Sequence, residues 1–371
     1  MLTKSLAGML LGCTLFQAAA MAQPASSLRA QPATPLRIGV MLCQTGACAE
    51  TGRAALKGVE LATEEINAKG GILGREVELV VQDTKEATSG GGSVSAFRAL
   101  IKNPEVKLLV GPTWDVGGMP LVPLMMQRSD LLLISPSVRI PEFSAVALNI
   151  FNLSPIDEPG VKKLAQVAFD KGWSSAAILS GQDNWASTQA KTFQAHFEQL
   201  GGKVVSVQEP LPTQVDLKSE LAKIVAKKPD VVLLTMIAHL PTAVKQLRQL
   251  GFTGHFLSVQ MDQARIAASG AAIEGIIFPK FEAPKGEFVS AFTAKYGTAP
   301  ETSAATGYDA ILLLSQAAKA CKGVSAMCLR STMRNSSFEG SSGQIHVNDQ
   351  RMAAREPALF EVQGAGFVEV R

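Results

Sequence analysis

The sequence has none of the short motifs that mark common catalytic sites, and few histidines. It contains no G-x-G-x-x-G motif after a strand, no P-loop lysine motif, no G-x-S-x-G elbow and no H-E-x-x-H motif. Gly90-Gly91-Gly92 lacks the strand-to-helix context of a phosphate cradle, so a flexible turn is the better interpretation. The histidines are scattered without the spacing of metal ligands: His196, His239, His255 and His346. We therefore expect no catalytic residue, no cofactor and no metal, and a protein that is not an enzyme.

Neither sign of charge is concentrated in one part of the chain. The 371 residues include 35 basic and 32 acidic ones, and the two signs are mixed along the sequence. A chain that binds nucleic acid normally carries a segregated basic patch, so we expect no nucleic-acid partner. Hydrophobic residues make up 47% of the chain, enough to bury the cores of two domains. We expect a two-domain monomer.

Residues 1–22 have the pattern of a secretory signal peptide. Lys4 gives a short positive start, residues 5–20 form an almost uncharged apolar run, and Ala20-Met21-Ala22 is an A-x-A cleavage site. No later run approaches the roughly 18 apolar residues that a membrane span needs. We therefore expect an exported protein whose mature chain begins near Gln23. A lipoprotein anchored through Cys13 is the alternative, because residues 10–13 (LLGC) resemble a lipobox.

Export leaves four cysteines, an even number in an oxidising compartment. Among the three connectivities, we favour two local disulfides because each pair is close in sequence and surrounded by small residues: Cys43 with Cys48 and Cys321 with Cys328. Four free thiols are the alternative. A zinc site is disfavoured, because neither pair has zinc-finger spacing and no histidine lies nearby in the sequence.

Short β-rich runs alternate with helical patterns once the chain has passed residues 23–35, a segment rich in Pro, Ala and Ser that we expect to be a disordered tether. In the first series, the predicted helix near Phe97 has Val94 and Ile101 on the same face. The remaining elements of this series are strands at 37–42, 76–82, 106–110 and 131–134, and a helix at 52–69 that Gly70-Gly71 ends.

The same alternation restarts after Asn152. It predicts strands at 176–179, 204–207 and 231–235, and helices at 186–200, 217–227 and 241–250. Two successive βα series predict an α/β fold of two doubly wound lobes, each with a parallel sheet. A tail beginning near Pro279 is too short of strands to form a third lobe; it adds helices at 288–296 and 304–321 and strands at 343–347 and 357–362.

Ligands of open α/β sheets bind beyond the carboxyl ends of the strands, so the turns that follow each strand indicate the site. These turns contain two of the three tryptophans together with hydroxyl, amide and charged side chains, a composition that suits a small polar molecule. The candidate ligand-binding residues are Gln44, Trp114, Asp115, Ser135, Ser137, Arg139, Asp183, Trp185, His239 and Gln260.

Two of these candidates carry opposite charges. If Arg139 and Asp115 bind the ligand, Arg139 offers a forked donor to a carboxylate, Asp115 accepts from an ammonium, amide or hydroxyl group, and the tryptophans stack on a flat group. If they bond only to each other, the ligand need carry no charge. For each there is also a plainer role: Asp115 could cap a helix and Arg139 could be a surface charge.

Several segments together resemble the leucine/isoleucine/valine-binding protein family, the periplasmic receptors of ABC importers. They are residues 45–52, 57–62 (KGVELA), 65–74 (EINAKGGILG), 109–112 (LVGP), 134–136 (ISP), 247–251 (LRQLG) and 338–343 (FEGSSG), with Asp83 after the second strand. Their order and spacing, over essentially the whole mature chain, make the resemblance specific. It implies a small-molecule receptor in the periplasm with an inner-membrane ABC permease as partner. An exported ligand sensor of the same fold is the alternative.

The resemblance also implies a type I periplasmic-binding fold with three crossings between lobes. The crossings are expected near 152–155, 278–281 and 338–342, which gives one lobe of residues 36–152 plus 280–339 and another of 153–279 plus 340–371. Members that bind amino acids usually have small hydroxyl residues where this chain has Trp114 and Asp115, and often an acidic residue where it has Gln260. An aliphatic α-amino acid is therefore not the ligand that the sequence favours.

Overall fold

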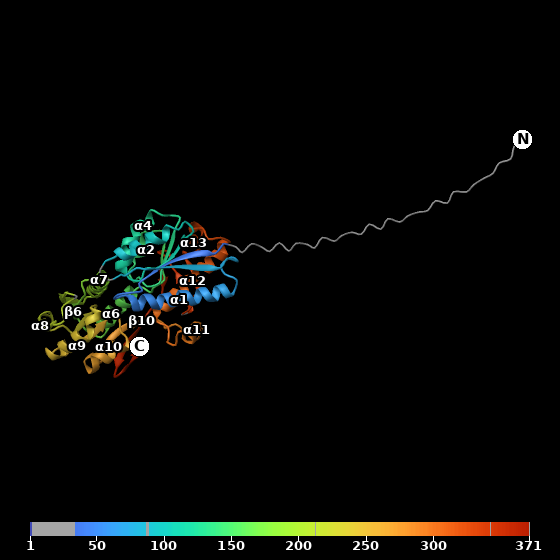
Figure 1. Cartoon of the computed structure of the whole chain (residues 1–371). Coiled ribbons are helices and arrows are strands. Elements are labelled where there is room, and N and C mark those ends of the chain that lie inside the picture. Colours follow the sequence, from blue (N-terminus) through green and yellow to red (C-terminus); the bar gives the residue numbers. More distant parts are fainter. Residues whose placement is uncertain (2–33, 87–88, 212, 342, 371) are drawn as a thin grey trace. The chain divides into compact units, whose positions relative to one another are not determined.

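The computed structural model describes residue 1 and residues 34–86, 89–211, 213–341 and 343–370. The expected signal peptide and nearly all of the expected tether lie outside these residues. Residues 34–371 form one compact unit, described below (Figure 1). Within the described ranges, no helix is both long and apolar enough to cross a membrane.

The first lobe is built on a five-stranded parallel sheet in the order β2-β1-β3-β4-β5. Side chains alternate between its two faces, so Ile38 and Val40 enter one core while Met41 enters the other. The central strands are buried on both faces, as parallel sheets covered by helices usually are. The strands are β1 (Leu36–Leu42), β2 (Val77–Asp83), β3 (Leu108–Val110), β4 (Leu132–Ser135) and β5 (Ile150–Asn152).

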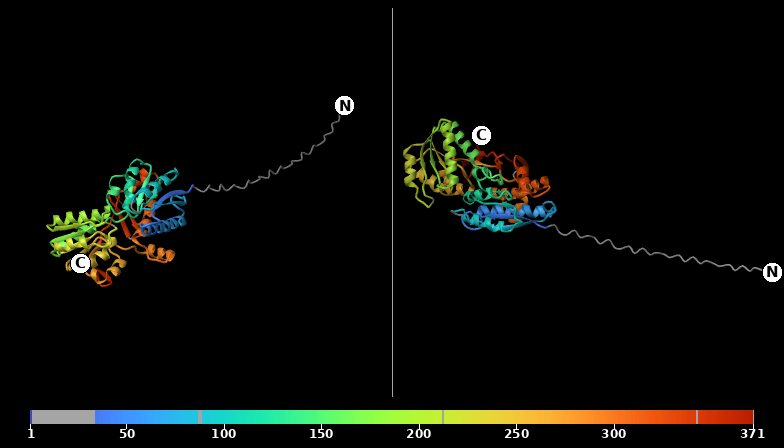
Figure 2. Two further views of the ribbon diagram at one scale, coloured as in Figure 1. Left: turned by 60° about the vertical axis from the view of Figure 1, so that its left-hand side comes forward. Right: turned by 90° about the horizontal axis from the view of Figure 1, so that it is seen from above.

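Two sets of helices cover the faces of this sheet. One core contains side chains of α1 (Ala49–Ala68), α11 (Glu287–Tyr296), α12 (Thr302–Cys321) and α13 (Ala326–Met333). The other contains side chains of α2 (Gly91–Ile101), η1 (Met119–Leu121), α4 (Val122–Met126) and α5 (Glu142–Ala145). Figure 2 shows α1 and α12, far apart in sequence, side by side. Glycine permits this approach, because a Cβ on Gly58 would collide with the carbonyl oxygen of Ala304.

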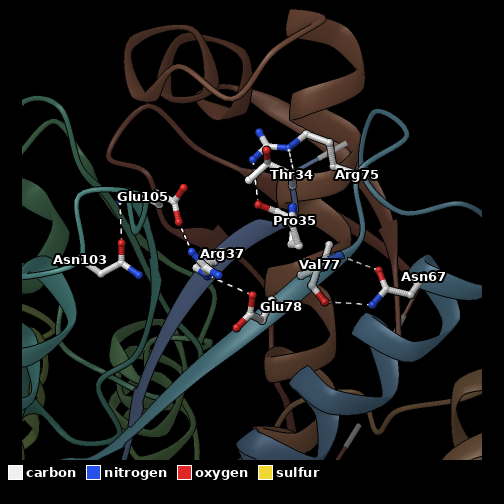
Figure 3. A network of polar contacts seen from close by, with 9 residues as sticks. All are labelled: Thr34, Pro35, Arg37, Asn67, Arg75, Val77, Glu78, Asn103 and Glu105. Carbon is white, nitrogen blue, oxygen red and sulfur yellow. Dashed lines mark hydrogen bonds and ion pairs between the residues drawn. The ribbon is translucent and has the colours of Figure 1, made fainter. Parts of the chain in front are cut away.

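Polar contacts fix the register at the start of the first sheet (Figure 3). Arg37 on β1 donates to Glu78 on β2 at 3.0 Å and also pairs with Glu105, which precedes β3. Asn67 in α1 forms two hydrogen bonds with the backbone of Val77: its side chain accepts from the N–H at 2.8 Å and donates to the carbonyl at 2.9 Å. These contacts join α1, β1, β2 and β3 at one edge.

The second lobe has a seven-stranded sheet in the order β15-β14-β10-β9-β8-β6-β7. Strands β6 to β10 are parallel, whereas β14 and β15 join antiparallel from the C-terminus. The strands are β6 (Ser175–Leu179), β7 (Lys203–Gln208), β8 (Val231–Leu234), β9 (His255–Ser258), β10 (Ile277–Lys280), β14 (Ala358–Gln363) and β15 (Gly366–Glu369). The helices are α6 (Glu158–Asp170), α7 (Asn184–Gln199), α8 (Lys218–Ala226), η2 (Ile237–His239), α9 (Leu240–Gln249), α10 (Gln263–Ser269) and η3 (Gly270–Ile273).

The structure differs from the expectation in the C-terminal tail. Residues 340–354 were expected in the second lobe, but β11 (Ser336–Gly340), β12 (Gly343–Val347) and β13 (Ala353–Ala354) form a small sheet of their own. Its apolar side chains, including Phe338 and Ile345, pack into the first lobe's core. Because β11 and β12 form a hairpin, burial of one strand carries the other with it. The third crossing therefore lies at residues 355–357, just before β14.

Helix α2 also differs in phase from the prediction. Its buried face consists of Ser93, Ala96, Phe97 and Leu100, whereas Val94 and Ile101 are half-buried. Phe97 therefore packs in the core as predicted, together with Leu100 and the small Ser93 and Ala96, while Val94 and Ile101 lie at the border of the contact.

Both local disulfides that the sequence favours are present. Cys43 pairs with Cys48 across the turn between β1 and α1, with the Cα atoms 5.8 Å apart. Cys321 pairs with Cys328 at 6.0 Å and joins the end of α12 to α13. Both Cα separations are within the usual range for disulfides.

Candidate ligand-binding site

The turn after β3 is held in place by a buried carboxylate that sequence reasoning did not single out. Glu86 is fully buried and accepts hydrogen bonds from the backbone N–H groups of Thr113 at 3.0 Å and Trp114 at 2.6 Å. The hydroxyl of Thr84 donates to it at 2.7 Å. Burial raises the pKa of Glu86, and the donors oppose that rise. Glu86 thereby fixes the backbone from which Trp114 and Asp115 project at the start of α3 (Asp115–Gly118).

The two serines after β4 have different roles. The hydroxyl of Ser135 donates to the carbonyl of Pro112 at 3.1 Å and accepts from the backbone N–H of Val138 at 3.1 Å, so it holds the turn together. Ser135 is fully buried and its hydroxyl is already bonded within the turn, so a direct ligand contact by Ser135 stays a prediction. Ser137 is 8% exposed, and its hydroxyl finds no hydrogen-bond partner among the described residues. Ser137 is therefore the better candidate for a ligand contact.

Asp157, a second residue that was not singled out, joins two candidates from different lobes. It lies at the start of α6 and is 2% exposed. The indole Nε1 of Trp185 donates to its Oδ2 at 2.7 Å, and the Arg139 guanidinium donates to its Oδ1 at 3.4 Å. Burial raises the pKa of Asp157, while Arg139 and Trp185 act in the opposite direction. A buried carboxylate with two donors holds both side chains in defined positions.

Trp185 also packs against both lobes. Its ring contacts the second lobe's core and the core of the first lobe that contains Phe143 and Val138. Arg139 comes from the turn after β4 in the first lobe, so the Arg139–Asp157–Trp185 contact spans the first crossing between lobes.

Asp115 faces acidic and amide groups from the second lobe rather than Arg139. Burial, and next the charge of Asp183, raise the pKa of Asp115, while the side chain of Asn184 lowers it through a hydrogen bond. Asp183 caps α7, accepting from the backbone N–H of Ala186 at 2.8 Å. The alternative in which Asp115 and Arg139 bond only to each other is not what the structure shows, because the ionic partner of Arg139 is Asp157. Two nearby carboxylates favour a cationic or donor group between them.

The remaining candidates form local contacts. Gln44 donates to the carbonyl of Leu42 at 3.3 Å, and the carbonyl of Gln260 accepts from Ser258 at 2.7 Å. His239 lies in η2, and its Nδ1 is buried without a partner among the described residues. No group of three His, Cys, Asp or Glu side chains in the described ranges is placed to hold a metal ion. The structure thus joins Arg139 and Trp185 through Asp157 and sets Asp115 beside Asp183, and it leaves the roles of Trp114, Gln44, His239 and Gln260 as predictions.

Comparison with known proteins places the chain among solute receptors. A family model described as "Periplasmic binding protein" matches residues 35–366. The chain is 25% identical over 249 residues to an amino acid binding protein of Pseudomonas aeruginosa, a match that covers 65% of each chain.

Two solved structures show the same fold. A leucine binding protein of Thermotoga maritima matches with a TM-score of 0.77 and 23% identity, covering 91% of this chain and 98% of its own. A solute binding protein of an ABC transporter from R. palustris, in complex with benzoate, matches with a TM-score of 0.75 and 22% identity over 91% and 95% of the two chains. These likenesses confirm the predicted α/β fold with two parallel-sheet lobes.

Proposed function

Because the chain belongs to the periplasmic binding protein family, a family of solute-binding proteins rather than enzymes, we propose that it is the receptor of an ABC importer of the branched-chain amino acid type. In this proposal it captures a small carboxylated molecule between its lobes in the periplasm and delivers it to an inner-membrane permease. The leucine and benzoate named for its structural neighbours support a carboxylate as the shared feature of the ligand.

The observation that carries this proposal is the Arg139–Asp157–Trp185 contact. Arg139 uses one guanidinium nitrogen for a single long contact of 3.4 Å to Asp157, which leaves its other donors for a ligand carboxylate. The unpartnered hydroxyl of Ser137, two residues away, offers a further donor. Trp114 and Trp185 supply flat surfaces for an apolar or aromatic body.

Asp115 and Asp183 define what the other end of the ligand carries. Burial, and next the charge of Asp183, raise the pKa of Asp115, and an ammonium or hydroxyl donor from the ligand would stabilise its ionised form. We propose that the ligand combines a carboxylate at Arg139 with a donor group at the two aspartates, and that an aromatic body suits the tryptophans better than a purely aliphatic one. Contacts from both lobes would stabilise the closed form, since a ligand shifts an equilibrium only through differential affinity.

Calorimetry with a matched series of compounds tests the assignment. Phenylalanine, benzoate and benzamide differ in the ammonium and carboxylate groups, so binding should require the carboxylate and tighten with a donor. Arg139→Lys keeps the charge and loses the fork, and it should weaken binding by about 1 to 3 kcal/mol, or roughly 5- to 150-fold. Arg128→Lys, which alters an exposed pair with Asp130, is the control and should bind normally. Equal binding of benzamide and benzoate would show that Arg139 does not hold a carboxylate.

A further inference from the structure

A surface hollow of the first lobe, separate from the candidate ligand site, is lined by three arginines and no acidic residue. Its volume is about 440 Å³, and its lining consists of Leu148, Met327, Arg330, Ser331, Arg334, Asn335 and Arg351. Five of these positions follow one another closely on α13 and just beyond it, while Arg351 comes from the loop between β12 and β13. We refer to it as the arginine hollow.

None of the three arginines in the hollow forms an ion pair with a carboxylate in the described part of the chain. No carboxylate of the described residues lies within 4.0 Å of any of its three guanidinium groups. Within the described residues their hydrogen-bond acceptors are backbone carbonyls: Arg334 donates to that of Asp349 at 2.9 Å, and Arg351 donates to those of Ser144 at 2.6 Å and Ala145 at 3.1 Å. Burial, and next the charge of Arg334, lower the pKa of Arg351, while the charge of Asp349 partly opposes them. Like charges are thus held close together here, and Asp349 offsets them only in part.

Arg351 is the most unusual of the three. It is only 4% exposed, and its Nε is buried without a hydrogen-bond partner among the described residues. Its backbone has a positive φ of 64°, a conformation that residues other than glycine rarely adopt. Burying a guanidinium with an unused donor is costly unless an anion or another acceptor completes it.

The border of the arginine hollow is apolar. Met327 is 67% exposed and Leu148 is 60% exposed, although both are large hydrophobic residues. A ligand with an anionic head and a short apolar tail would satisfy the guanidinium groups and cover these two side chains.

We propose that the arginine hollow is a second binding site, for an organic phosphate whose dianionic head contacts Arg330, Arg334 and Arg351 and whose apolar part covers Leu148 and Met327. A phosphate carries close to two negative charges at neutral pH, so it offsets three guanidinium charges better than a carboxylate does. The phosphate can belong to a free metabolite or to a lipid whose headgroup is a phosphomonoester, because the dianion at the arginines is the same in both.

NMR of the full-length mature protein with 13C-methyl methionine tests the proposal. The Met327 methyl signal should shift and saturate with butyl phosphate, and more weakly with inorganic phosphate, while Met261 in the second lobe reports binding elsewhere. Failure to saturate below about 10 mM butyl phosphate, a barely measurable affinity, would overturn the proposal. Because the carboxylate series above is tested at Arg139, either proposal can fail without the other.

Charge-removing variants locate the site. Arg330→Gln and Arg334→Gln alter partly or fully exposed side chains, so they should fold normally and each weaken butyl phosphate about tenfold or more, as loss of a charged hydrogen bond does. Arg98→Gln, an exposed arginine on α2, is the control and should leave the affinity unchanged. Arg351→Lys tests the buried position and should also weaken binding. Equal affinity in all four variants would overturn the assignment.

Vesicles distinguish the two sources of phosphate. Flotation with phosphatidic acid vesicles but not with phosphatidylglycerol or phosphatidylcholine vesicles, lost in Arg334→Gln, would assign the site to a phosphomonoester lipid. Binding of butyl phosphate without flotation would assign it to a soluble metabolite. Binding of an acidic peptide at Met327 with no response to butyl phosphate would instead show a protein-docking surface and contradict the proposal.

Discussion

The hydrogen bond between Trp185 and Asp157 should contribute measurably to the free energy of unfolding, and the substitution of Trp185 tests how much. Trp185→Phe removes the indole N–H, which donates at 2.7 Å to a carboxylate that is 2% exposed, and keeps most of the ring. Hydrogen bonds to charged groups contribute about 1.5 to 3 kcal/mol, and Asp157 would retain only the longer contact to Arg139. We therefore expect the free energy of unfolding at neutral pH to fall by about that amount.

Urea unfolding followed by circular dichroism measures this loss. Trp173→Phe is the matched control, because Trp173 stacks on His255 with ring centroids 4.1 Å apart and has no recorded hydrogen bond from its indole. Its loss should be under about 1 kcal/mol, since an aromatic pair contributes about 0.5 to 1.5 kcal/mol and phenylalanine retains part of the stacking. A loss in Trp185→Phe no larger than in Trp173→Phe would refute the reasoning.

The dependence on pH adds a second criterion. Burial raises the pKa of Asp157, so keeping this carboxylate ionised lowers the stability of the folded protein. That stability is regained when Asp157 becomes protonated, as the pH falls through its folded-state pKa. The Trp185 donor favours the ionised form and thus lowers that pKa. Removing it raises the pKa of Asp157 further, and the difference in stability between wild type and Trp185→Phe should shrink in acid. A difference that stays constant from neutral pH down to acid would show that the indole does not bond to an ionised Asp157.

Three further predictions follow from other contacts. Burial raises the pKa of Asp309, which pairs with Arg355, to about 6, so lowering the pH through 6 should stabilise wild type relative to Asp309→Asn in urea titrations; parallel pH profiles would contradict this. Ser135→Ala should lower the free energy of unfolding by about 1 kcal/mol or more, because its hydroxyl bonds within the turn. Ser137→Ala should leave the stability unchanged and weaken ligand binding in calorimetry. Equal unfolding curves for the two variants would show that the two hydroxyls do not differ in this way. Intact mass of the secreted protein should show a mature chain beginning near Gln23 that gains four hydrogens on reduction, and free thiols in the folded protein would contradict both disulfides.

The two-lobed architecture and its elements were determined by local pattern. Alternation of β-rich runs and helical periods places most strands and helices of the structure within a few residues, as with β12 at Gly343–Val347. Close cysteine pairs predict their own disulfides, because loops of five and seven residues leave few other partners within reach. These features depend on neighbours in sequence, which is why the sequence suffices for them.

Only the tertiary structure decided which lobe takes the small sheet and which side chains hold the candidate site. The hairpin of β11 and β12 joins the first lobe because Ile345 and Val347 face its core, a choice between two hydrophobic surfaces that periodicity cannot make. Glu86 and Asp157 are ordinary acidic residues in the sequence, and their importance arises from complete burial beside donors from distant segments. Ser135 and Ser137 likewise differ only in which hydroxyl the fold has already used, because a hydrogen-bond partner is a property of three-dimensional packing and not of residue type.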